Sequence, residues 1–61
     1  MHTESVLVES LEEGDTIIVD GQQMVVDDYY ENGKMDGIWI RMTSGFHRFF
    51  PYDSKIELVV R

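Results

Sequence analysis

Three dipeptides ending in glycine divide this chain into short apolar runs, and they constrain its fold more than any other feature. They are Asp20-Gly21, Asn32-Gly33 and Ser44-Gly45. Asp-Gly and Asn-Gly tolerate the positive φ angles of a type I′ turn, whose twist matches that of paired strands. Each dipeptide therefore predicts a β-hairpin, with Ser44-Gly45 as the third candidate. Consecutive hairpins in so short a chain predict a strongly twisted meander.

The runs between these turns have the composition of strands. Val, Ile, Tyr, Phe, Trp and Thr are frequent, Ala is absent, and no helical period continues long enough to predict a real helix. Pro51 has no N–H to donate, so it should end the fifth strand or lie at a sheet edge. We expect six strands, at about residues 4–10, 15–20, 23–30, 37–43, 46–50 and 55–60.

A twisted meander of this size tends to curl and hide its edges. The 61 residues predict one small domain, residues 1–61, with a small core and marginal stability. We expect a barrel of five to six short antiparallel strands, closed by contact between the first strand and the last.

Two segments resemble known small barrels. The segment from Val8 to Val26, VESLEEGDTIIVDGQQMVV, resembles the opening of many SH3-like barrels, and the N-terminal half resembles barrels of the elongation factor P and KOW types. The ending FPYDSKIELV, from Phe50 to Val59, resembles small uncharacterised barrels of bacteriophages and actinobacteria. The resemblance implies an all-β, small SH3-like barrel that is phage-encoded. Its motifs shape strands and turns, so it implies no catalytic residue.

Several kinds of protein are disfavoured by composition. The chain has no cysteine, which excludes disulfides and thiolate metal sites. No apolar run approaches the roughly 20 residues of a membrane span. The start, MHTESVLVE, lacks the basic region of a secretory signal. The expectation is a cytoplasmic protein that makes no use of a membrane.

Charge is divided unevenly along the chain. Residues 1–33 carry nine acids and no Lys or Arg, whereas residues 34–61 carry all five bases and three acids. The simplest interpretation is that the acids keep a small domain soluble. A second interpretation is an acidic mimic of nucleic acid that occupies the basic groove of a host enzyme and inhibits it; such binding would be strongly screened by salt.

Catalytic and metal chemistry have weak signals. His2 lies near the start, and His47 is more typical of a partly buried strand residue than of a general base or ligand. Counting Asp28 as the first position of an EF-hand loop puts Tyr30 at the third position and Trp39 at the twelfth, so the calcium pattern fails. We expect no enzyme activity, no cofactor and no metal.

The segment RMTSGFHRFF, residues 41–50, is the candidate binding site. If Ser44-Gly45 is a two-residue turn, Arg41 lies opposite Arg48, and the core face holds Ile38, Ile40, Met42, His47 and Phe49. The opposite face then forms the predicted site, which consists of Trp39, Arg41, Phe46, Arg48 and Phe50. A three-residue loop would instead move Arg48 and Phe50 to the other face.

These residue types fit more than one occupant. Trp and Arg are enriched at protein-binding hot spots, and aromatic residues beside arginines also stack on bases. Internal packing is the third interpretation: acids of residues 1–33 could pair with Arg41 and Arg48, or a second copy could cover the face. We predict a non-enzymatic binding or accessory module that acts through a protein partner or self-association. A nucleic-acid-binding barrel is the alternative.

Overall fold

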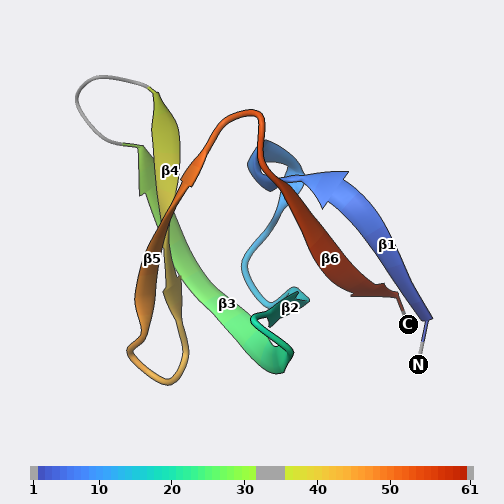
Figure 1. Cartoon of the computed structure of the whole chain (residues 1–61). Coiled ribbons are helices and arrows are strands. Elements are labelled where there is room, and N and C mark those ends of the chain that lie inside the picture. Colours follow the sequence, from blue (N-terminus) through green and yellow to red (C-terminus); the bar gives the residue numbers. More distant parts are fainter. Residues whose placement is uncertain (1, 32–35, 61) are drawn as a thin grey trace.

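The structure is a computed structural model that describes residues 2–31 and 36–60, and these residues form one sheet of six antiparallel strands (Figure 1). Helical structure in the described part is limited to the 3-10 turn η1, so no helix there is long and apolar enough to cross a membrane. The elements are β1 (His2–Leu7), η1 (Val8–Ser10), β2 (Thr16–Val19), β3 (Gln22–Glu31), β4 (Gly37–Met42), β5 (His47–Pro51) and β6 (Lys55–Val60).

The order of strands across the sheet is β1-β6-β2-β3-β4-β5. Strand β6 therefore lies between β1 and β2, and it pairs along its whole length with β1. The all-β prediction is confirmed, and so is the predicted contact between the first and last strands. That contact does not close the sheet, however, because β1 and β5 stand at opposite ends of the order.

Strand β3 joins the two halves of the sheet. Its first residues pair with β2, and its later residues pair with β4. The register shifts between Val26 and Asp28, which marks a β-bulge at Asp27. A bulge bends a strand and increases its twist. In Figure 1, β3 starts beside β2 and runs up across β4 and β5, while β6 and β1 lie on the opposite side of the molecule.

The core lies on the inner face of this bent sheet. Its central members Ile17 and Ile40 are fully buried, on β2 and β4 respectively. Burying such a side chain contributes about 1.5–3 kcal/mol relative to leaving it exposed. Among residues 2–31 and 36–60, the buried hydrophobic residues are Val8, Leu11, Ile17, Val19, Val26, Ile38, Ile40, Met42, Phe50 and Ile56.

The turns largely follow the expected chemistry. Asp20 and Gly21 both have positive φ, 51° and 79°, as a two-residue type I′ turn requires. Pro51 ends β5, as predicted, and the backbone N–H of Ser54 donates to its carbonyl at 2.9 Å. The predicted turn at Asn32-Gly33 lies outside the described residues.

Candidate functional site

The connection between β4 and β5 has three residues, and the two-residue turn expected at Ser44-Gly45 is wrong. The backbone N–H of Met42 donates to the Phe46 carbonyl at 2.8 Å, so these two residues close the hairpin. Gly45 has a φ of 93°, and its N–H donates to the Met42 carbonyl at 2.9 Å. This is the pattern of a tight turn followed by one residue in the left-handed region.

The longer loop shifts every pair of the hairpin by one residue. Arg41 lies opposite His47, Trp39 opposite Phe49, and Ile38 opposite Phe50. The two arginines are therefore not opposite each other. Phe50, only 7% exposed, takes the core position that had been assigned to Phe49. The physical reason is the loop: Gly45 takes the left-handed region as a third loop residue, and this shift of one position exchanges the two faces of β5.

The five residues predicted as one site are divided between two faces. Trp39 and Arg41 point to the outside of the sheet, whereas Phe46, Arg48 and Phe50 belong to the inner side. Phe46 stays exposed at the end of the hairpin. The structure thus keeps only part of the predicted patch together, and it adds other residues to that part. We call the resulting surface the outer face, which consists of Asp27, Asp28, Tyr30, Trp39, Arg41, His47 and Phe49.

An aromatic row crosses the outer face. Tyr30, Trp39 and Phe49 come from three neighbouring strands and lie directly opposite one another in the pairing. The Trp39 and Phe49 ring centroids are 5.5 Å apart with the rings tilted by 57°, a favourable arrangement for aromatic pairs. Tyr30 is 49% exposed and the other two are half-buried. The three aromatic residues therefore form a row across neighbouring strands, on the side of the sheet facing away from the core.

Gly37 makes room for the last ring of this row. A β-carbon at Gly37 would lie 2.3 Å from Cζ of Phe49 and 2.6 Å from the Phe50 carbonyl oxygen. Any larger residue would thus collide with both a side chain and the backbone. The ring of Phe49 covers the glycine, which is a recognised way to protect a glycine in a sheet.

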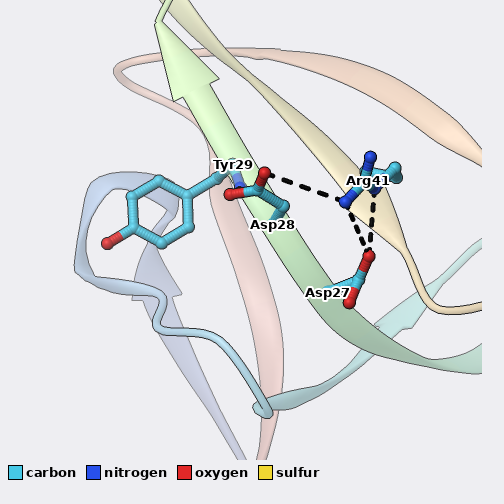
Figure 2. A network of polar contacts seen from close by, with 4 residues as sticks. All are labelled: Asp27, Asp28, Tyr29 and Arg41. Atoms are coloured by element: carbon cyan, nitrogen blue, oxygen red, sulfur yellow. Dashed lines mark hydrogen bonds and ion pairs between the residues drawn. The ribbon is translucent and has the colours of Figure 1, made fainter.

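The bulge in β3 directs two carboxylates at one arginine. Figure 2 shows Asp27 and Asp28 both turned towards Arg41, while Tyr29 points away from it. Arg41 Nε donates to Asp27 Oδ2 at 3.0 Å, and Arg41 Nη2 lies 2.9 Å from the same oxygen. Asp28 Oδ2 is more distant, at 3.8 Å from Nη2. These side chains are about half exposed, so each pair contributes less than about 1 kcal/mol.

Arg48 makes its contacts on the other side of the sheet. Its Nη1 donates to Asp20 Oδ2 at 2.6 Å, and its guanidinium carbon lies 5.6 Å from the centroid of the Phe50 ring. The bridge connects the edge strand β5 with the β2–β3 turn. Since the partners of both arginines come from the first 33 residues, the predicted pairing of those acids with Arg41 and Arg48 is confirmed.

Other acids gather away from the outer face. Glu4, Glu13 and Asp15 line a groove of about 420 Å³ beside Leu58 and its neighbours on β6. The described residues include no group of acids and histidines arranged to hold a metal ion.

Partial burial and a hydrogen bond to Glu31 raise the pKa of Tyr52 above its usual 10.0. Tyr52 therefore remains a neutral hydrogen-bond donor at physiological pH.

In comparisons with known proteins, no family model matches this chain, and no curated protein or solved structure matches it either. The resemblance to SH3-like, elongation factor P and KOW barrels thus stays a prediction.

Sequence reasoning missed five members of the outer face: Asp27, Asp28, Tyr30, His47 and Phe49. The strand alternation of residues 23–30 gave no warning that a bulge would put two adjacent aspartates on one side. The sequence did contain one signal of the bulge, namely two adjacent acids, Asp27 and Asp28, inside an otherwise apolar strand. A regular strand would turn one of them towards the core. What the geometry offers chemically is an aromatic row bordered by charged groups, which suits binding.

Proposed function

We propose that this protein is a non-enzymatic binding module that docks a protein partner on its outer face. The observation that supports this most is the aromatic row of Tyr30, Trp39 and Phe49 on the side away from the core. Trp and Tyr are enriched among the residues that dominate protein–protein binding energy, since they bury large areas with few rotatable bonds.

The composition of the two faces strengthens this proposal. The inner face already supplies the core with aliphatic residues and Phe50, so folding alone does not require aromatic rings on the other side. Contiguous apolar surface on a small domain is unfavourable in water unless something covers it. A partner that covers the row would remove that penalty.

A nucleic acid partner, the alternative class, receives less support from the charges. On the outer face the two aspartates outnumber Arg41, and both contact it. Arg48, which the sequence had placed beside Arg41, faces the inner side and is paired with Asp20. A phosphate backbone is recognised mainly by unpaired Lys and Arg, and this face presents an excess of carboxylate instead.

For the architecture, we propose that the sheet is an open form of a small SH3-like barrel. The sharp bend of β3 and the pairing of β1 with β6 support this, because both wrap the sheet around one core. A solved structure that showed β1 and β5 far apart, with no curl of the sheet between them, would contradict it.

Affinity capture with matched variants tests the binding function. The immobilised protein would be exposed to extract from the cells that express it, alongside Trp39→Ala and Phe46→Ala. Phe46 is a suitable control because it is an exposed aromatic residue, 43% accessible, that does not belong to the outer face. We expect proteins retained by the wild type to be lost with Trp39→Ala and kept with Phe46→Ala. Equal retention by both variants, with thermal unfolding confirming that they are folded, would refute the proposal.

A further inference from the structure

The outer face carries one carboxylate that is only partly neutralised. Arg41 directs both of its close contacts, at 2.9 and 3.0 Å, to a single oxygen of Asp27. Asp28 Oδ2 lies 3.8 Å away from the guanidinium, at the limit of an ion pair, and the side chain is 49% exposed. Its other oxygen, Oδ1, accepts the backbone N–H of Tyr29 at 2.8 Å, which fixes its orientation. Two aspartates against one arginine leave this part of the face with net negative charge.

This carboxylate lies next to the aromatic row. Asp28 and Tyr30 are two positions apart on β3 and share a face, so their α-carbons are separated by roughly 6.5–7 Å in an extended strand. Arg41 and Trp39 occupy the opposing positions on β4. A cation placed over the ring of Tyr30 or Trp39 would therefore be within reach of the Asp28 carboxylate. Aromatic faces attract cations because of their negative quadrupole, and Trp does so most strongly.

We propose that the outer face binds an arginine-bearing segment of a protein partner. The guanidinium would stack on the aromatic row and donate to Asp28. Arginine fits better than lysine because its planar group can stack on a ring and present N–H donors in the same plane. The proposal rests on the proposed function and names the chemistry of the partner. The net charge of −7 adds attraction at longer range, since it favours encounter with a basic partner.

Peptide titration followed by NMR tests this proposal directly. The probes are a blocked peptide of alternating glycine and arginine and the same peptide with citrulline, which is close in shape but uncharged. The chain contains one tryptophan, Trp39, so its indole N–H signal reports on the aromatic row without ambiguity. We expect the arginine peptide to shift Trp39 and its neighbours on β3–β5, and the citrulline peptide to do so much less.

Two substitutions that each remove one negative charge distinguish binding at this site from general electrostatic attraction to the acidic protein. Asp28→Asn keeps the oxygen that accepts from Tyr29, and we expect it to weaken binding of the arginine peptide about three-fold. Glu57→Gln makes the same charge change on β6, in the other half of the sheet, and should leave binding nearly unchanged. Equal weakening by both variants would show that only net charge matters, and it would overturn the proposal.

Substitution of Arg41 tests whether the partner is cationic or anionic, because the two cases predict opposite changes in affinity. Arg41→Gln would release Asp27 from its ion pair and leave two carboxylates beside the row. We expect this variant to bind the arginine peptide about two- to three-fold more tightly. For an anionic partner the same substitution would weaken binding, because it removes a positive charge from the face. Weaker binding of the arginine peptide by this variant, once thermal unfolding shows it is folded, would count against the proposal.

The remaining outcomes distinguish this proposal from the proposed function. Shifts confined to the groove of Glu4, Glu13 and Asp15 would place cation binding elsewhere and overturn the inference alone. The same holds if a glutamate peptide or single-stranded DNA shifts Trp39 and the arginine peptide does not. Trp39-dependent capture of a protein partner would then still stand. Loss of that dependence, by contrast, would remove the proposed function and this inference together.

Discussion

The β2–β3 turn and the β4–β5 loop both end in glycine, but they set the register of their strands in different ways. In the first, Asp20 and Gly21 both have positive φ, and two residues suffice. In the second, Gly45 has positive φ and Ser44 does not, so Thr43 also joins the loop. Asp tolerates the left-handed region better than most residues because its short side chain can hydrogen-bond locally. The residue before the glycine therefore decides the length of the loop, and with it which side chains become core.

The largest expected effect comes from the two adjacent phenylalanines of β5. Phe50→Ala should lower the free energy of unfolding by about 3–5 kcal/mol, because it empties a buried core position. Phe49→Ala should cost clearly less, since its ring is only half-buried on the outer face. Urea denaturation of both variants measures the difference. A greater loss for Phe49→Ala would mean that the β4–β5 hairpin has the two-residue register after all.

Gly37→Ala tests how closely β5 packs against the neighbouring strand. The new methyl group would collide with the Phe49 ring and with the carbonyl oxygen of Phe50, and the backbone atom cannot easily move. We expect a loss of about 1–3 kcal/mol in denaturant unfolding. In the two-residue register Phe50 would take the place of Phe49 beside Trp39, so a ring would cover Gly37 there too. A neutral substitution would therefore show that the Phe49 ring and the Phe50 carbonyl do not pack closely against Gly37.

Alanine substitutions before each glycine compare the two connections most directly. Asp20→Ala should cost about 1–2 kcal/mol, since it puts an alanine at positive φ and removes the partner of Arg48. Ser44→Ala should change stability by less than about 0.5 kcal/mol, because it affects neither a positive φ nor a buried contact. Thermal unfolding of the pair checks this. Equal losses of stability in the two variants would show that the residue before the glycine does not set the length of these two connections.

The smallest expected effect comes from Asp20→Asn, which tests the contribution of the Asp20 charge alone. Asp20→Asn keeps a residue that accepts positive φ but loses the ion pair with Arg48, which is partly exposed. We expect a loss of less than about 1 kcal/mol, and the difference from wild type should shrink further in about 0.5 M salt. A loss as large as that of Asp20→Ala, measured in parallel, would show that the bridge rather than the backbone angle dominates at this position.

Much of the fold could be read from local signals. The six strands lie within a few residues of their predicted bounds, because short apolar runs and turn residues determine them locally. The order of strands could not be read in this way, since the place of β6 between β1 and β2 depends on long-range pairing. The pairing of β1 with β6 was expected, but its consequence was not: it leaves the sheet open.

The candidate site was harder to predict than the fold because it depends on register. A shift of one residue exchanges the faces of a strand, so one misjudged loop was enough to move Arg48, Phe46 and Phe50 out of the patch. Trp39 and Arg41 kept their places because β4 itself alternates regularly, with Ile38, Ile40 and Met42 buried on its other side. The two aspartates that meet Arg41 depend on the bulge, an irregularity that strand periodicity does not encode.

The position of β6 also has a consequence for the way this chain is made. Ribosomes synthesise proteins from the N-terminus, so β1 and β2 emerge long before the strand that separates them in the finished sheet. Until residues 55–60 have appeared, β1 has no neighbour and β2 has only β3. The hairpins of the other half can form early, whereas the half around β6 must wait. This half of the sheet is therefore completed only after residues 55–60 have been made, when β6 inserts between two strands that precede it in the chain.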